Sequence, residues 1–165
     1  MTKILLLSDT HSHLDDVILK YAQQADEIWH AGDIGSFEVT DTLKKMGALR
    51  AVHGNIDDAA MQKEHPLDLR FRCENVPVYM THIGGYPPKY NARTRALVRA
   101  NPPKLFICGH SHILKVIWDK DLGVLHMNPG ACGRHGFHQM RTMLRFSVDG
   151  SNIQDLEVVE LGKRG

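Results

Sequence analysis

Ile4-Leu5-Leu6-Leu7-Ser8-Asp9-Thr10-His11 is a short apolar run that ends in a carboxylate and an imidazole side chain. A continuous apolar run of this length is typical of a buried strand in an α/β sheet. The same pattern recurs at four more places, where apolar runs end in His30-Ala31-Gly32-Asp33, His53-Gly54-Asn55, Thr81-His82 and Gly109-His110-Ser111-His112. Because ligands bind at the carboxyl ends of the strands in open α/β sheets, we expect these side chains to meet at one edge.

The segments around these runs predict helices and further strands. Apolar residues at helical spacing favour helices over residues 15–25, 37–46 and 92–100. Short apolar or alternating segments predict strands over residues 3–8, 27–30, 49–53, 68–73, 76–81, 104–108, 114–118, 124–127, 141–148 and 153–161. Asp149-Gly150 is a favourable hairpin turn between the last two strands. Helices that alternate with strands, followed by antiparallel hairpins, indicate an α/β fold, a four-layer α/β/β/α sandwich of two mixed sheets.

Length and composition narrow the class of protein. The 165 residues suit a single domain over residues 1–165, and 42% hydrophobic with 24% charged residues is ordinary for a soluble globular chain. A net charge of +1 gives no field that would attract nucleic acid or an anionic membrane, and no apolar run is long enough to span a bilayer. Three widely spaced cysteines without a CxxC motif favour reduced thiols and a cytoplasmic location.

Seven side chains at the predicted strand ends can bind metal ions. They are Asp9, His11, Asp33, Asn55, His82, His110 and His112. Asp9 with His11, and His110 with His112, are two residues apart, so in an extended segment each pair would face one point. Glycines before Asp33, Asn55 and His110 would let the backbone turn as each strand ends. Seven ligands are too many for one tetrahedral ion and suit two ions that share a carboxylate. Because the ligands are oxygens and imidazoles without a thiolate, Mn, Fe, Zn, Ni and Co are all compatible, and calcium is disfavoured.

The order of these motifs resembles that of the calcineurin-like metallophosphoesterase superfamily. The family pattern D-x-H, G-D, G-N, a lone H and G-H-x-H is matched by Asp9-Thr10-His11, Gly32-Asp33, Gly54-Asn55, His82 and Gly109-His110-Ser111-His112. The short chain and Asn128-Pro129-Gly130 resemble its small bacterial phosphodiesterase branch, to which the retromer scaffold subunit is also similar. The resemblance covers residues 3–130.

The resemblance implies two divalent transition-metal ions, with manganese favoured over Fe, Ni, Zn or Co. Asp9, His11, Asp33 and His112 would hold the first ion, and Asp33, Asn55, His82 and His110 the second, with Asp33 as the bridge. The implied activity is hydrolysis of phosphodiesters or activated phosphomonoesters by a hydroxide bound between the ions, and Asp33, Asn55 and His82 are the expected catalytic residues. A small-molecule phosphoester would be the substrate.

One position departs from the family pattern. Many members have a histidine after the Asn of the G-N motif, where it is a proposed general acid, but this chain has Ile56. Isoleucine cannot donate a proton, so we expect aryl esters to react far faster than alkyl esters. Asp57, the next residue, would orient a ligand through a hydrogen bond.

Other residues and functions stay open at this level. Asn55 is also a candidate substrate contact. The loop with Arg134 and His135 would either contact substrate phosphate or be solvated, and His138 lies in the same loop. His30 and His53 precede ligand-bearing loops and favour a supporting role. The alternatives to a phosphodiesterase are a non-catalytic metal-binding scaffold of the same fold and a nucleotide phosphatase or dinucleoside polyphosphate hydrolase. Exposed strands in the second half would allow a homodimer.

Overall fold

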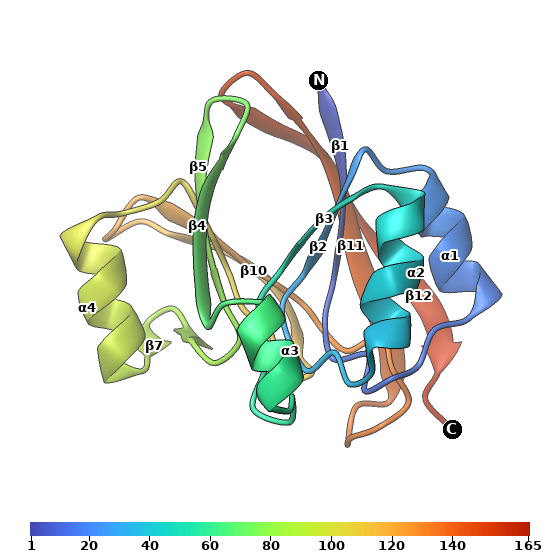
Figure 1. The fold of residues 1–165 in the computed structure, drawn as a ribbon. Helices are drawn as coiled ribbons and strands as arrows, with labels where there is room; N and C mark the ends of the chain where they lie inside the picture. The colour runs from blue at the N-terminus through green and yellow to red at the C-terminus, as the bar shows by residue number, and fades with distance from the viewer.

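Two five-stranded mixed sheets face each other in the computed structural model, which describes residues 1–165 (Figure 1). The first sheet has the order β12-β11-β1-β2-β3, with β1 Thr2–Leu7, β2 Glu27–His30, β3 Ala48–Ala51, β11 Met140–Asp149 and β12 Asn152–Lys163. The second has the order β4-β5-β8-β10-β9, with β4 Asp68–Cys73, β5 Val76–Thr81, β8 Leu105–Ile107, β9 Leu114–Asp119 and β10 Val124–Pro129. In each sheet three neighbouring strands pair in parallel, and the remaining two pairings are antiparallel.

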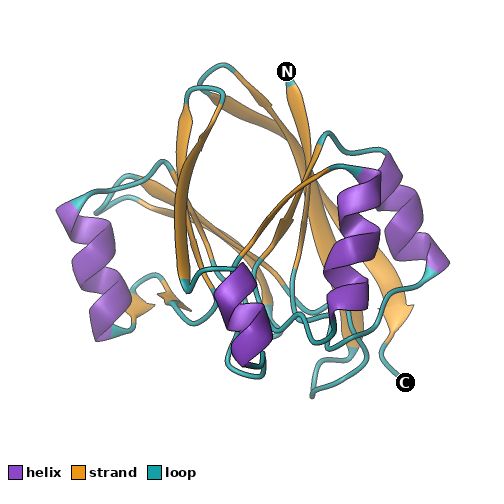
Figure 2. Ribbon diagram, viewed as in Figure 1, coloured by secondary structure: helices purple, strands orange, loops and turns teal.

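Helices lie on the outer sides of both sheets, which confirms the predicted sandwich (Figure 2). Two helices, α1 Asp16–Gln23 and α2 Phe37–Met46, pack beside the first sheet, and α4 Ala92–Ala100 packs beside the second. The short α3 Ala59–Glu64 and the small hairpin of β6 Gly85–Tyr86 and β7 Lys89–Tyr90 were not predicted. Only Met61 of α3 is buried, so this helix has no apolar periodicity to read. None of the helices has the length and apolar character that a bilayer-spanning segment needs.

The two faces of β1 explain why its sequence is apolar without interruption. Ile4 and Leu6 belong to the core between the sheets, together with Trp29, Ile107 and other buried side chains. Leu5 and Leu7 point the other way and pack with residues of α1 and α2. A strand that is covered on both faces needs apolar residues at every position, and this is the physical basis of the pattern at residues 4–7.

The last hairpin differs from its predicted position by one residue. Asp149 pairs with Asn152, so the two-residue loop is Gly150-Ser151 rather than Asp149-Gly150. Gly150 has φ +61°, a left-handed conformation that glycine adopts at little cost. Asp149 and Asn152 can therefore remain in the ladder, and both strands are longer than predicted.

Candidate metal centre

The metal edge is the edge of the sandwich at which the parallel strands β1, β2, β3, β5 and β8 end, and it lies at the bottom of Figure 1. Backbone hydrogen bonds join its loops within each sheet, from Asp9 N to Gly32 O (2.9 Å) and from Gly109 N to His82 O (3.0 Å). Contacts across the two sheets are equally close. The ring Nδ1 of His82 lies 2.7 Å from Ala31 O, and the amide of His110 donates to Asp9 Oδ2 at 3.2 Å. The edge is thus closed by contacts between both sheets.

Six of the seven sequence-predicted side chains form two groups at this edge. Asp9, His11 and His112 make the first group, and Asp33, His82 and His110 make the second; within each group the potential ligand atoms lie within 4.8 Å of one another. In the first group His112 Nε2 is 3.2 Å from Asp9 Oδ1. In the second group His82 Nε2 is 3.2 Å from Asp33 Oδ1. Each group offers one carboxylate and two imidazoles.

Asp33 and Asn55 connect these groups to their surroundings. The two oxygens of Asp33 face different partners: Oδ1 faces His82, and Oδ2 lies 3.4 Å from His11 Nε2 in the first group. This position suits a carboxylate that bridges two ions. Asn55, the seventh predicted residue, is exposed, and its Oδ1 lies 3.0 Å from His110 Nδ1. It is therefore beside the second group rather than inside it.

Three buried atoms of the two groups make no hydrogen bond. They are Asp9 Oδ1, His11 Nε2 and His82 Nε2. Buried polar atoms normally have partners, because an unmade hydrogen bond in the interior costs about 1–3 kcal/mol. These three atoms lie close to carboxylate or imidazole ligands without hydrogen-bond geometry to them, which is the arrangement that cations between them would satisfy. The residues present thus fit divalent metal ions bound by oxygen and imidazole.

The backbone at these residues is left-handed, contrary to the extended geometry expected from their spacing. The φ angles are +57° at Asp9, +44° at His11, +54° at Asp33, +72° at His110 and +61° at His112. Such angles cost of order 1–3 kcal/mol at a non-glycine residue and are concentrated at functional sites. The expectation that His110 and His112 face one point is wrong, because these turns direct them into different groups. Asp9 and His11 do share a group.

The glycines of the motifs serve close packing more than sharp turning. Only Gly32 has a left-handed φ, +103°. A Cβ atom at Gly54 would lie 2.1 Å from Asp33 Oδ1, and one at Gly109 would lie 2.2 Å from Ser8 Oγ. A Cβ atom at Gly32 would lie 2.5 Å from His82 Nδ1, so all three glycines are needed because the loops of the metal edge touch at these points.

The imidazoles around Asp33 favour the ionised form of its carboxyl group. Burial by itself would raise the pKa of Asp33, but the imidazoles of His11 and His82 outweigh it and hold that pKa well below its usual range. Burial opposes the charged form of His82, and the contact with Asp33 nevertheless raises its pKa. Burial and the neighbouring ring of His82 lower the pKa of His110. The carboxylate of Asp33 is therefore negative at neutral pH, which is the form that binds a cation.

Asp57 and His30 support the ligand-bearing loops. The buried carboxylate of Asp57 accepts hydrogen bonds from the amides of Gly54 (2.7 Å), Ile34 (3.1 Å) and Gly35 (2.8 Å), and so joins the loop of Asn55 to that of Asp33. His30 is fully buried, its Nδ1 accepts from Gly32 N at 3.1 Å, and burial lowers its pKa to about 4. Both residues act on the centre through the backbone.

Two cavities open beside the centre, and Asn55 lines both of them. The first, about 460 Å³, is lined by residues of both groups and by the exposed side chains Ile56, His135 and Phe137. The second, about 400 Å³, has His53, Gln62, Leu67, Asn91 and Arg93 among its lining residues. Arg134 lines neither, because its guanidinium donates to Arg164 O at 3.1 Å. Of the three predicted substrate contacts, Asn55 and His135 line the first cavity and Arg134 does not.

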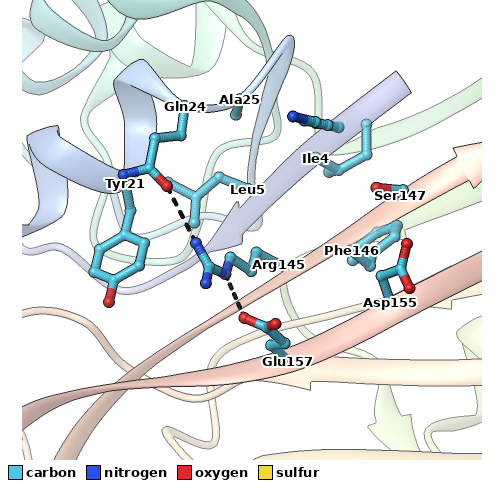
Figure 3. Close-up of a pocket in the computed structure, with 11 residues that line it drawn as sticks. Ile4, Leu5, Tyr21, Gln24, Ala25, Arg145, Phe146, Ser147, Asp155 and Glu157 are labelled. Carbon is cyan, nitrogen blue, oxygen red and sulfur yellow. Dashed lines mark hydrogen bonds and ion pairs between the residues drawn. The ribbon is translucent and has the colours of Figure 1, made fainter. Parts of the chain in front are cut away.

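A third cavity lies away from the metal edge and holds no comparable group (Figure 3). It has about 200 Å³ and lies between α1 and strands of the first sheet. Arg145 on its wall donates to Glu157 (2.6 Å) and Gln24 (3.2 Å). Arg145 and Glu157 therefore form an ion pair within this cavity.

His138 is a contact of the centre that the sequence did not distinguish. It lies in the loop after β10, and its Nδ1 is 3.2 Å from Nδ1 of His112. The only signal was a histidine in a glycine-rich loop, which does not say where its ring points. Ser8 was missed as well, although its hydroxyl donates to Asp9 Oδ2 at 2.6 Å.

Comparison with known sequences identifies a family and related proteins. A family model described as a calcineurin-like phosphoesterase superfamily domain matches residues 2–151. A probable metallophosphoesterase of Methanocaldococcus jannaschii is 26% identical over 132 residues, which cover 76% of this chain and 66% of that protein, just under two thirds of its length. A probable metallophosphoesterase of Methanothermobacter thermautotrophicus is 25% identical over 162 residues, 95% of this chain and 91% of that protein.

Solved structures share the whole fold. An archaeal phosphodiesterase is 19% identical with a TM-score of 0.76, and the match covers 96% of this chain and 99% of that one. Vps29 of Entamoeba histolytica in complex with Zn²⁺ is 14% identical with a TM-score of 0.75, and the match covers 99% of both chains. At these identities the likeness establishes the architecture alone.

Proposed function

The chain belongs to the calcineurin-like phosphoesterase superfamily, a family of metal-dependent phosphoesterases, and from this premise we propose that it hydrolyses phosphodiesters at a dinuclear metal centre. The observation that carries the proposal is the set of three buried, unpaired ligand atoms distributed over two groups. A single ion would leave part of this set unused. Asp33 faces both groups with separate oxygens and is proposed as the bridge.

In the proposed centre Asp9, His11 and His112 would hold one ion, His82, His110 and Asn55 would hold the other, and Asp33 would contribute to both. Two such ions would supply charge neutralisation for the phosphoryl oxygens and acidify a water molecule. Manganese is the proposed metal, with Fe, Ni, Zn and Co as alternatives that have compatible ligand chemistry.

The two cavities beside the centre support a diester as the substrate class. A phosphodiester carries two ester groups on phosphorus, and two cavities that share Asn55 in their lining lie beside the centre. His135 is proposed to contact the substrate in the first cavity. Ile56 also lines this cavity and offers no proton to a leaving group, so the proposal favours esters with acidic leaving groups. The archaeal phosphodiesterase of the same fold agrees with this substrate class.

The proposal extends to the cellular context. We propose a small-molecule phosphoester as the substrate and a cytoplasmic location, and we propose neither nucleic acid nor a membrane as a partner. The near-neutral charge and the three free, buried cysteines support this setting.

A metal-replacement assay tests the activity. Metal-stripped protein would receive Mn, Ni, Co, Zn or Fe in turn, with bis(p-nitrophenyl) phosphate and p-nitrophenyl phosphate as substrates. We expect metal to restore diester hydrolysis in the wild type and in Asp41→Ala, a control on the exposed face of α2, but not in Asp33→Ala. Stoichiometric metal binding without turnover of either substrate would contradict the proposal and favour the scaffold alternative.

A further inference from the structure

We propose that His138 is a positioning residue that fixes the tautomer of His112 and thereby sets the affinity of the first group for its metal ion. The inference rests on the proposed dinuclear centre and adds a residue outside its ligand set. It starts from two hydrogen-bond distances: His138 Nε2 lies 2.9 Å from Gly133 O, and His138 Nδ1 lies 3.2 Å from His112 Nδ1. We call this series of contacts, from His112 through His138 to Gly133, the relay.

The direction of the relay follows from its end. A backbone carbonyl can only accept, so His138 Nε2 carries a proton and donates it to Gly133 O. In a neutral imidazole the other nitrogen, Nδ1, is then an acceptor. It accepts from His112, whose proton is therefore on Nδ1. This leaves a lone pair on His112 Nε2, the atom that faces Asp9 Oδ1 at 3.2 Å in the first group.

This tautomer is the one that metal binding needs. A neutral imidazole binds a metal through the nitrogen that has no proton, and its other N–H is usually held by an outer partner. Without His138 the proton of His112 could move to Nε2, where it would be directed at Asp9 and occupy the metal position. An outer partner of this kind typically contributes about 10–100-fold to metal affinity.

The carbonyl that ends the relay is held on the metal edge itself. Gly133 N donates to Asp9 O at 3.2 Å, and Cys132 N donates to Ser8 O at 3.1 Å. A Cβ atom at Gly133 would lie 2.4 Å from Thr10 O, so the loop has no room to shift at this point. The relay therefore returns to the backbone of Asp9, a ligand of the same group.

The loop is also shaped around the two rings. Gly136 has φ +129°, and a Cβ atom there would lie 2.3 Å from His112 Nδ1 and 3.2 Å from His138 Nδ1. Behind His138, its own carbonyl accepts from Arg164 Nε at 2.8 Å, and Gln139 O accepts from Arg164 N at 2.9 Å. These contacts keep the ring of His138 against His112 on a loop whose tip, Phe137, is fully exposed.

Titration calorimetry with Zn²⁺ as the probe tests the relay in metal-stripped full-length protein. His138→Phe retains the ring volume without hydrogen bonds, and we expect one of two Zn²⁺ sites to weaken by about 10–100-fold. In His138→Gln the amide can donate to Gly133 O and accept from His112, so we expect affinity within about threefold of wild type. The exposed neighbour Gln139→Ala is the control for changes in the loop and should bind as wild type does.

A spectroscopic measurement separates the relay from a packing role. In Zn²⁺-loaded wild type and His138→Gln, long-range ¹H–¹⁵N correlations should place the His112 proton on Nδ1, and His138→Phe should lose that hydrogen-bonded signal. Equal Zn²⁺ affinity of His138→Phe and wild type, or equal weakening of the Phe and Gln variants, would overturn the relay and leave the metal centre in place. Wild-type protein that binds no Zn²⁺ would overturn both.

Discussion

Each end of the sandwich has an acidic residue with a left-handed backbone. The carboxylate is hydrogen-bonded at one end and has an unpaired oxygen at the other. At the top of Figure 1, beside the turns of the β4–β5 and β11–β12 hairpins, Glu74 has a left-handed φ of +49°. Its carboxylate is fully occupied, since it accepts from Thr2 Oγ1 (2.6 Å) and Gly150 N (2.7 Å) and pairs with the N-terminal amine (3.4 Å). At the metal edge Asp9 has a similar φ of +57°, but its Oδ1 is buried without a partner.

Backbone strain alone therefore does not identify a functional site in this protein. A left-handed carboxylate can simply close a hairpin when its hydrogen bonds are made within the fold. At the metal edge the same backbone conformation comes with unmade hydrogen bonds at several ligands. We therefore read strain together with unpaired buried atoms as the functional signal.

The largest expected effect tests this comparison directly. Asp9→Asn retains the shape of the side chain but removes the negative charge, and we expect diester hydrolysis to fall by at least about 10⁴-fold, because enzymes typically accelerate reactions by about 10⁶-fold or more and the centre carries that chemistry. Glu74→Gln, the matched change at the opposite end, should retain full activity. Initial rates with bis(p-nitrophenyl) phosphate would measure both. Similar losses in the two variants would remove the distinction between the two ends.

The next largest effect concerns the leaving group of the substrate. Ile56 lines the first cavity and cannot donate a proton to that group. We expect aryl diesters to react about 10²–10⁴-fold faster than alkyl diesters, the range that positioned proton transfer commonly contributes. Ile56→His should narrow this ratio, while Ile113→His, at another exposed isoleucine of the same cavity, should not. Equal rates for aryl and alkyl diesters in the wild type would show that another donor serves the leaving group.

A smaller effect, on metal affinity and stability, is expected at Asp57, a carboxylate of the metal edge whose oxygens already accept hydrogen bonds. Asp57→Asn replaces an acceptor of three amides with a group that has only one acceptor oxygen. We expect metal affinity to fall by about 10–100-fold and the free energy of unfolding to fall by about 1–3 kcal/mol. Calorimetry and denaturant unfolding of metal-free protein would measure these. Asp58→Asn retains a side chain able to cap α3 and is the adjacent control.

His126 provides a contrast to the ligands, because its Nδ1 is buried and unpaired although it belongs to neither ligand group. Burial lowers its pKa to about 4. The unfolded chain therefore binds a proton that the folded chain does not between about pH 6.5 and pH 4, so stability should fall as the pH falls through this window. The loss should reach about 3 kcal/mol at most. Between the same pH values the free energy of unfolding of His126→Leu should fall by that much less than that of the wild type, measured with a chelator present. The same dependence of stability on pH in the two proteins would contradict this interpretation.

Local patterns were sufficient for most of the fold. Helices α2 and α4 and strands β4 and β5 lie where the sequence predicted them, because each has a clear apolar period and a clear break. The six-residue α3 and the β6–β7 hairpin are too short to carry such a period. The turn at Gly150-Ser151 differs by one residue because strand pairing with β11, rather than local turn preference, determines where the loop begins.

The sequence alone indicated which side chains lie together at the metal edge, because apolar runs that end in Asp, Asn and His place those residues at one edge of a parallel sheet. The tertiary structure alone decided how they meet. Left-handed turns separate His110 from His112, a carbonyl of the C-terminal segment holds Arg134 away from the centre, and a folded-back loop brings His138 to His112. These outcomes depend on contacts between segments far apart in the chain, and no local period or spacing records such contacts.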